Sequence, residues 1–460
     1  MKDLNKENAL PSIRRIWGIS FPIMLSMLAE NIIGITDIAF IGHYASTATK
    51  LNVAQGMIGA AGIGAIYYFV LFMIGFGFAT GVQILISRRN GERNFAEIGG
   101  IFETGLLFLW GMAVLIIVIS LIFTPIVLPL MMRSTEVTNI ASDFLSIRVF
   151  GLLFSFAVVS FRAFHVGTTN TKPLTYASII MAGCNIFLNW VFIFGNLGAP
   201  EMGVEGAASA SVTTELLGAA FLFAYNGRKT IRRKFKLFVF APASGKTLRN
   251  ILNISVYVML QYSVSLATWL MFFLFIEKTG KVHLDSSQLV RSLYSLVTIT
   301  GWAYAVCTST LVSNSIGEGR GDIVPAIIRR MVTVSACTTF IFVLPLWIFP
   351  SEMLSIFTTD KHLIEISVPA LRIVAGAILC FSIAVVPFNG VSGTGKTQMA
   401  MIMELISLAI YSGGLYLIYL QYFHRPSVFW YSEYIYWGII AILSCIYLYS
   451  GRWKKGMYEI

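Results

Sequence analysis

The chain has 460 residues, of which 57% are apolar and only 12% are charged, and its formal net charge is +11. Soluble globular proteins have roughly 45–50% apolar and about 25% charged residues, so this composition excludes a disordered chain and argues against a water-soluble enzyme. An integral membrane protein is the class that remains, and the excess of Lys and Arg must then be explained by where these residues lie along the chain.

Twelve apolar runs follow one another along the sequence. About 20 apolar residues cross a hydrocarbon core of roughly 30 Å as a helix, whereas strands of a membrane barrel are short and alternate in polarity. We therefore predict an all-α integral membrane protein with twelve transmembrane helices. The runs cover residues 15–41, 56–86, 96–124, 139–166, 174–195, 204–225, 250–276, 289–315, 326–349, 366–389, 398–421 and 432–450.

The Lys and Arg residues of the connections are distributed unequally between the two sides of the membrane. One set of ends and loops holds 23 of them and the opposite set holds 6, or 7 if Arg291 is included. Because positive loops stay in the cytoplasm, both termini are predicted to be cytoplasmic in a multi-pass protein of the cell (inner) membrane. The basic stretch RKTIRRKFK at 228–236 is then a cytoplasmic linker facing anionic lipid, and no nucleic-acid partner is expected.

An internal repeat relates the two halves of the chain. At a constant offset of 226 residues, similar segments recur at the ends of spans two and eight and after spans four and ten: Ser87, Gly91, Glu92 and Gly167 recur as Ser313, Gly317, Glu318 and Gly393. We predict an N-lobe at 1–226 with spans one to six, a basic linker at 227–247, and a C-lobe at 248–460 with spans seven to twelve. Such parallel repeats occur in transporters and place the substrate site between the halves, near the membrane midplane.

The stretch GVSGTGKT at 390–397 satisfies the pattern of a phosphate-binding loop, GxxxxGK[ST]. That loop requires a preceding strand and a soluble α/β domain, whereas this stretch joins two apolar spans. We interpret it as a tight cytoplasmic turn in which glycines supply unusual dihedral angles, and we expect no ATP binding and no enzymatic activity.

Four acidic residues stand inside the predicted spans: Glu30 and Asp37 in span one, Glu215 in span six and Glu404 in span eleven. A charged side chain at the centre of a membrane helix costs roughly 2.5–3.5 kcal/mol on insertion scales, so such residues are functional candidates by default. Glu30 and Asp37 are seven positions apart, which places both carboxylates on one face of a helix. They could bind a proton or a sodium ion, or serve as structural hydrogen-bonding groups.

Neutral polar residues and a proline add to this group. Asn185 and Asn189 are four positions apart in span five, so both amides face the same way. Their carbonyl oxygens would suit Na⁺ together with Asp37, and their NH₂ groups would suit an acidic partner, although such residues also join helices by packing. Pro22 removes a main-chain hydrogen bond from span one and allows a kink there.

Five segments, in this order, resemble conserved segments of multidrug and toxic compound extrusion (MATE) transporters. They are ITDIAFIGHYAS (35–46), FATGVQILISRRNGER (78–93), FRAFHVGTTNTKPL (161–174), NIFLNWVFIFG (185–195) and GVEGAASASVTTE (203–215). The resemblance covers nearly the whole chain. It implies two pseudo-symmetric six-helix lobes in a V-shaped bundle. It also implies export of organic, often cationic and amphipathic compounds in exchange for H⁺ or Na⁺, without another cofactor. We expect the protein to act as a monomer.

The resemblance also suggests where a coupling cation would bind. In DinF-type members the cation site lies in the N-lobe, and local alignment places its residues on Asp37, Asn185, Asn189 and Ser211. Asp37 and Asn185 agree with the family pattern. Asn189 and Ser211 depart from it, because relatives carry an Asp and a Thr there.

Two further acids bear on this departure. Glu30 and Glu215 fall where amides are common in relatives, so we expect acidity to have moved within the same cavity. In NorM-type members the C-lobe carries acids on helices seven and ten. The matching places here are Gln261 and Ser382, which leaves Glu404 as the nearby C-lobe candidate.

An alternative function is a flippase for lipid-linked oligosaccharides, from the wider superfamily with this architecture. Such anionic substrates would favour a cavity lined with Arg and Lys. The basic residues within the predicted spans are Arg148, Arg162 and Arg372, whereas the deep charges are acidic, so we favour the exporter.

Overall fold

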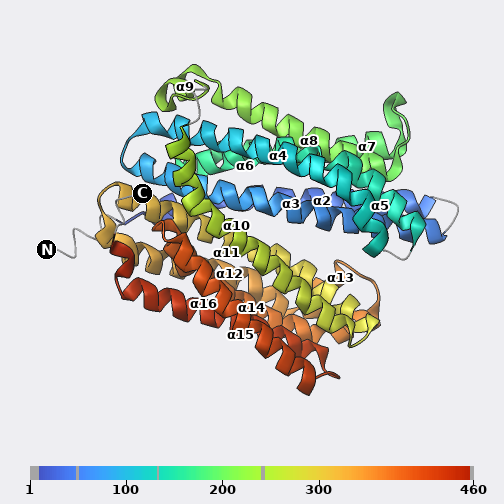
Figure 1. Ribbon diagram of the computed structural model, residues 1–460. Coiled ribbons are helices and arrows are strands. Elements are labelled where there is room, and N and C mark those ends of the chain that lie inside the picture. The colour runs from blue at the N-terminus through green and yellow to red at the C-terminus, as the bar shows by residue number, and fades with distance from the viewer. Residues whose placement is uncertain (1–9, 48–50, 132–133, 240–243, 456–460) are drawn as a thin grey trace. The chain divides into compact units, whose positions relative to one another are not determined.

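A computed structural model describes residues 10–47, 51–131, 134–239 and 244–455 of the chain. Throughout these ranges every regular element is an α-helix or a short 3-10 turn (Figure 1). Eleven helices are long and apolar enough to cross a membrane, and a bent pair of helices forms a twelfth candidate span. The described part of the chain therefore agrees with the twelve predicted runs.

The helices group into two compact units. The N-terminal unit comprises Leu25–Ile86 and Asn94–Ser255, and the C-terminal unit comprises Met1–Met24, Ser87–Arg93 and Val256–Ile460. The lobe boundaries drawn from the sequence repeat, at 226 and 248, stay a prediction.

The N-terminal unit contains most of the first half of the chain, coloured blue to green in Figure 1. Its elements are α2 (Ile13–Thr47) from Leu25 onward, α3 (Leu51–Gly91) up to Ile86, α4 (Phe95–Met131), α5 (Thr135–Arg148), α6 (Gly151–Gly167), α7 (Lys172–Phe194), η1 (Asn196–Gly198), α8 (Gly203–Asn226), α9 (Lys229–Phe235) and the first part of α10 (Gly245–Glu277).

The C-terminal unit contains α2 up to Met24, α3 from Ser87, the rest of α10, and the helices after α10, which are coloured yellow to red in Figure 1. Its further elements are α11 (Lys281–Gly317), η2 (Gly321–Ile323), α12 (Val324–Ile348), α13 (Pro350–Ser355), α14 (Lys361–Gly393), α15 (Thr397–Gln421), η3 (Pro426–Tyr431), α16 (Ser432–Tyr449) and η4 (Arg452–Lys454).

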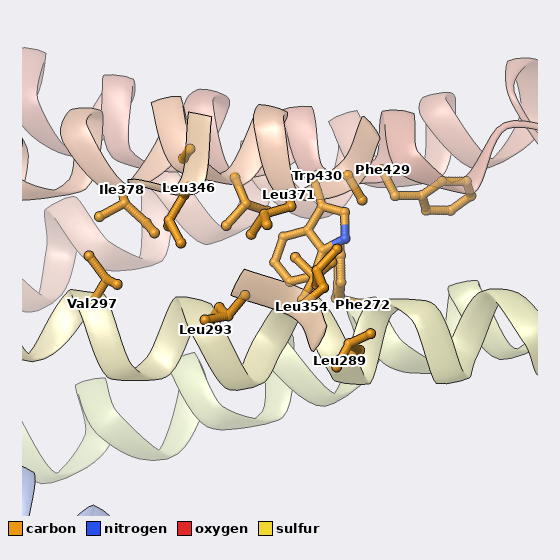
Figure 2. Close-up of a cluster of buried hydrophobic side chains, with 14 of the residues drawn as sticks. Phe272, Leu289, Leu293, Val297, Leu346, Leu354, Leu371, Ile378, Phe429 and Trp430 are labelled. Atoms are coloured by element: carbon orange, nitrogen blue, oxygen red, sulfur yellow. The ribbon is translucent and has the colours of Figure 1, made fainter. Parts of the chain in front are cut away.

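Each unit has a buried apolar core of its own. Figure 2 shows part of the core of the C-terminal unit, where Phe272, Leu293, Leu371 and Trp430 pack between helices. In the N-terminal unit, Phe144 belongs to a cluster drawn from six of the helices. Lipid is as apolar as these side chains, so close van der Waals packing rather than exclusion of water holds such helices together.

The internal repeat is visible in how two glycines pack. A Cβ on Gly167 would come within 3.1 Å of the main-chain oxygen of Gln83, and one on Gly393 within 2.6 Å of that of Ser309. The offset of 226 residues relates both the glycines and their partners. Each glycine therefore permits the same close approach between two helices of its own unit, which supports the repeat that the sequence predicts.

The predicted run 139–166 is divided into α5 and α6, which meet at an angle of 50°. At the junction, the N–H of Phe150 donates to the carbonyl of Ile147 and that of Leu152 to the carbonyl of Val149. These bonds to the third residue back tighten the helix locally, as in a 3-10 turn. The bend contains no proline; it lies between Arg148 and Gly151, which belong to a buried polar group described below.

The structure also bears on the predicted turn at 390–397 and on the basic linker. The stretch GVSGTGKT begins within α14, which ends at Gly393, and α15 begins at Thr397, so a helix precedes the turn and not the strand that a phosphate loop requires. Gly395 in the turn has a φ of +90°, as a tight glycine turn predicts. Part of the basic linker is the short helix α9, whereas Lys2, Lys6, Lys50, Arg133 and residues 240–243 lie outside the described residues.

Candidate functional site

Four of the predicted cation-site residues come together around the carboxylate of Asp37 on α2. Asn185 and Asn189 on α7 donate from their amide nitrogens to Oδ1 of Asp37, at 3.0 and 2.6 Å. Ser211 on α8 donates its hydroxyl to Oδ2 at 2.6 Å. The side chains of Asn185, Asn189 and Ser211 are buried. We call these four residues the Asp37 cluster.

Local sequence explains why α7 and α8 can form this cluster. Asn185 and Asn189 stand one helical turn apart, and the amide of Asn189 also donates to Oδ1 of Asn185 at 3.2 Å. At the start of α8, a Cβ on Gly206 would overlap the main chain at Phe192. This glycine, in a segment rich in Gly, Ala and Ser, lets the two helices approach closely and brings Ser211 to the carboxylate.

The cluster has the chemistry of a cation site. Three donors stabilise the ionised carboxylate of Asp37, and a proton bound there would replace part of that stabilisation. The carboxylate, the two amide carbonyls and the Ser211 hydroxyl together offer five oxygens, which are the ligand type that Na⁺ prefers. Oδ1 of Asn189 is buried without a hydrogen-bond partner. It is an acceptor left for a proton donor or a cation.

Glu215 lies in a different polar group, at the bend between α5 and α6. Arg148 donates to both carboxylate oxygens of Glu215, at 2.6 and 2.9 Å, in a bidentate ion pair. Tyr68 on α3 donates to Glu215 at 3.1 Å and bonds Ser155 on α6 at 2.8 Å. The guanidinium of Arg148 stacks on the Tyr68 ring, 3.6 Å from its centroid. Glu215 is therefore neutralised by a base, and Arg148 also acts electrostatically on Asp37.

Gly151 leaves room for that ion pair. A Cβ at Gly151 would overlap Nη1 of Arg148 and Oε2 of Glu215. We expect Gly151→Ala to lower the free energy of unfolding by about 1–3 kcal/mol, as overpacking of a filled interior does. Thermal unfolding of the purified variant measures this loss. Gly111→Ala is the matched control, because a Cβ at Gly111 on α4 meets nothing within 4 Å. Equal stability of the two variants would contradict this packing.

Glu30 lies apart from Asp37, in the wall of a pocket between α2, α6, α7 and α8. Arg162 on α6 donates to Glu30 at 3.2 Å, and its guanidinium lies over the Phe76 ring. The Glu30 side chain is 44% exposed, whereas that of Arg162 is only 6% exposed. Apart from these two charges and two serines, the pocket is lined by apolar side chains. The cavity has a volume of about 20 Å³, which is room for about one water molecule, so an organic substrate could enter here only if these helices moved apart.

The C-terminal unit contains the secondary candidates. Glu404 on α15 is buried and accepts hydrogen bonds from Ser265 on α10 and Tyr436 on α16. Gln261 lies one turn before Ser265 on α10, and its main-chain carbonyl accepts from the Ser265 hydroxyl at 2.9 Å. The main-chain carbonyl of Ser382 accepts from Ser335. Glu404 therefore lies among polar groups, although Gln261 and Ser382, which match the acidic positions of NorM-type members, are not acidic.

Sequence reasoning missed a second buried carboxylate in this unit. Glu433, at the start of α16, accepts hydrogen bonds from Tyr294 and Trp437, both at 3.1 Å. It stands at the edge of an apolar run, where acidic residues usually face water. The repeat finds only its tyrosine partner, because the offset of 226 takes Tyr68, the partner of Glu215, to Tyr294 but takes Glu215 itself to Ala441. Pro22, the predicted kink, lies inside the continuous helix α2.

Comparisons with known proteins agree with this architecture. The MatE family pattern matches residues 22–191 and 253–413 of the chain. The chain is 23% identical over 463 residues to a probable multidrug resistance protein NorM of Thermotoga maritima, covering 99% of this chain and 96% of that protein. It is 23% identical over 394 residues to the probable NorM of Pasteurella multocida, covering 85% and 83%.

Solved structures share the fold. An outward-facing multidrug resistance MATE family transporter of the MOP superfamily superposes with a TM-score of 0.85 at 16% identity, over 96% of both chains. Proteins of this architecture have twelve helices in two lobes, and the chain is a multi-pass membrane protein of that kind. The chain belongs to the MatE family of multidrug efflux transporters.

Proposed function

We propose that this protein is a secondary antiporter that exports organic compounds by alternating access, in exchange for H⁺ or Na⁺ bound at the Asp37 cluster. The observation that carries the proposal is the convergence of Asn185, Asn189 and Ser211 on one membrane carboxylate without a base in hydrogen-bonding contact. Such a carboxylate can exchange a cation, whereas Glu30 and Glu215 are each paired with an arginine.

Coupling requires that cation and substrate stabilise different conformations. Loading Asp37 with a cation removes its charge and weakens the hydrogen bonds from α7 and α8. The position of α2 relative to these two helices would then differ between the loaded and empty states. A substrate that enters between the helices beside Glu30, where the cavity is now about 20 Å³, would contact α2, α7 and α8 as well, so the two ligands would compete through α2.

We propose amphipathic, cationic substrates. The pocket beside Glu30 is mainly apolar, and its exposed charge is the carboxylate of Glu30. Arg148 and Arg162 are each held in an ion pair with a glutamate. They therefore offer little free positive charge to an anionic oligosaccharide lipid, which favours export of organic cations over the flippase alternative.

The experiment is efflux of a fluorescent organic cation from proteoliposomes, with proton and sodium gradients imposed separately. We expect one gradient, and not the other, to accelerate efflux, which also identifies the coupling ion. Efflux that neither gradient changes, while the purified protein still binds the dye, would contradict antiport. We expect a single chain to carry out transport as a monomer, because the predicted N-lobe and C-lobe both belong to one chain.

We also propose that both termini are cytoplasmic, as the distribution of Lys and Arg indicates. Leu197, in the exposed turn between α7 and α8, is then extracellular, and Lys229 at the start of α9 is cytoplasmic. In a cysteine-free background, an impermeant thiol reagent should label Leu197→Cys in intact cells, and Lys229→Cys only after permeabilisation. The reverse pattern would overturn the orientation.

A further inference from the structure

Two faces of α11 differ in character near its proposed extracellular end. Leu289 and Leu293 belong to the apolar core of the C-terminal unit (Figure 2). Arg291 stands two positions from each leucine, and because successive residues of an α-helix are rotated by about 100°, its side chain lies on the opposite face. The exposed Ser295 continues that face one turn further along the helix. A cation therefore stands on the side of α11 that faces away from the core.

Arg291 is nevertheless half-buried. The helix Lys281–Gly317 is a candidate membrane span, and Arg291 lies about 15 Å along its axis from Lys281. Two aromatic rings of α10 lie against its guanidinium: Cζ is 5.6 Å from the ring centroid of Trp269 and 5.5 Å from that of Phe273. These two rings meet edge to face. They attract a cation, but they do not provide the oxygen acceptors that the N–H groups of a guanidinium need.

No carboxylate of the described residues neutralises Arg291. It forms no ion pair and no hydrogen bond with these residues, and no acidic group among them acts on it electrostatically. Its Nε is buried without a hydrogen-bond partner. The other arginines of the spans differ, because Arg148 and Arg162 pair with glutamates and Arg372 is exposed. A charge at membrane depth is costly without an anion, so the donors of Arg291 are available to a bound molecule.

Gln288, one turn before Arg291 on α11, presents a second unused polar group. Its Oε1 is buried and has no hydrogen-bond partner within the described part of the chain. Side chains three positions apart on a helix are neighbours, so the amide and the guanidinium can contact the same molecule. The amide offers two donors besides this acceptor. A ligand with an oxyanion and an adjacent hydroxyl or N–H group would use both side chains.

We propose that Arg291, with Gln288 and the rings of Trp269 and Phe273, binds the oxyanion of an amphipathic molecule: a carboxylate or phosphate attached to an apolar body. The planar guanidinium can donate two parallel hydrogen bonds to such a group, which a point charge cannot do. The two aromatic rings provide an apolar surface against which the body of the molecule packs.

Two sources can supply this chemistry. One is the phosphate of a phospholipid headgroup in the extracellular leaflet, toward which a long basic side chain can extend from a membrane helix. The other is an organic acid that the transporter itself binds. The site belongs to the C-terminal unit. Export of organic cations, proposed from the pocket beside Glu30 in the N-terminal unit, does not depend on it.

The test is thermal unfolding of the purified full-length protein in a non-ionic detergent, with and without two acidic probes. Phosphatidylglycerol represents the lipid and naphthalene-2-carboxylate the organic acid; dioleoylglycerol and naphthalene-2-carboxamide are their neutral counterparts. A ligand that binds the folded protein alone raises the unfolding temperature. We expect at least one acidic probe, and neither neutral one, to stabilise the wild type. Arg291→Gln should raise the apparent Kd of that probe about tenfold or more, because a charge-assisted two-point contact is lost.

Two further variants separate the site from general charge. Lys281→Gln removes an exposed cation from the same helix and should bind the probes like the wild type. Arg291→Lys keeps the charge but loses the planar fork, and should bind with intermediate affinity. Stabilisation by phosphatidylglycerol alone identifies a lipid site and by the carboxylate alone an organic-acid site; either result, or both together, supports oxyanion binding. If neither acidic probe stabilises the wild type, or both stabilise Arg291→Gln equally well, the proposal is overturned.

The ligand-free variant provides an independent check. Because Arg291 has no anion partner among the described residues, Arg291→Gln should unfold at the wild-type temperature or above it. Breaking the pair of Arg148 and Glu215 should lower that temperature instead. A large decrease for Arg291→Gln would show that this arginine already has a partner within the protein, and the inference would fail.

Discussion

Cells that carry Asp37→Asn should export no more organic cation than cells without the transporter, while the amount of protein in the membrane stays normal. Asparagine has nearly the shape of aspartate. Its oxygen can accept from Asn185 and Asn189, and its NH₂ group can donate to the Ser211 hydroxyl, which replaces the three hydrogen bonds of the carboxylate. Folding is thus preserved, but the charge that would bind H⁺ or Na⁺ is lost.

The measurement is accumulation of a fluorescent cation in cells at matched protein levels, determined by immunoblot of the membrane fraction. Asp143→Asn is the control, because Asp143 is an exposed acid on α5 in the same unit. We expect it to export like the wild type. If Asp37→Asn exports at the wild-type level, the Asp37 cluster is not needed for transport, whatever the control shows.

Breaking the ion pair between Arg148 and Glu215 should produce the largest loss of stability of any substitution considered. The two side chains are only 13% and 12% exposed, so Arg148→Met leaves a carboxylate without its partner in a dry environment. Removing one partner of a buried pair costs about 3–5 kcal/mol. Tyr68 remains as a donor to Glu215, but one neutral hydrogen bond replaces little of a bidentate charged one.

Unfolding of the purified variants in detergent, followed by circular dichroism, measures this cost. The double variant Arg148→Met/Glu215→Met removes both charges and should be more stable than Arg148→Met alone, because no unpaired charge remains. Glu318→Gln breaks an ion pair that is 38% exposed on both sides and should change stability by at most about 1 kcal/mol. Additive effects of Arg148→Met and Glu215→Met would show that the pair is not coupled.

Much of the fold could be predicted from the sequence, because apolar runs of membrane length and the charge of their loops are local signals. The bend within the run 139–166 could not. It contains no proline, and it coincides with a polar group whose members, Tyr68, Arg148 and Glu215, are far apart in sequence. A single sequence does not show which arginine meets which glutamate, so the sequence places Glu30 and Glu215 in one cavity with Asp37 but does not predict their ion pairs with Arg162 and Arg148.

Some residues of the candidate site could likewise be predicted from the sequence, and others could not. The spacing of Asn185 and Asn189 predicts two amides on one face of a helix, and that is how they reach Asp37. The place of Ser211 came from family resemblance alone, since a serine among small residues of an apolar helix is usually a packing residue. Glu433 was missed because it begins an apolar run. Its burial depends on α11 and α14 to α16 packing around it, which is a tertiary property.

Substrate-induced cation movement in proteoliposomes tests the central claim most directly. Vesicles containing the wild-type protein and a pH- or Na⁺-sensitive dye receive a pulse of organic cation, and the flux of the coupling ion is recorded; vesicles with Asp37→Asn are treated identically. If the Asp37 cluster carries the coupling ion, the pulse should move that ion in wild-type vesicles and produce no flux with Asp37→Asn. Equal ion flux from both proteins would contradict the account.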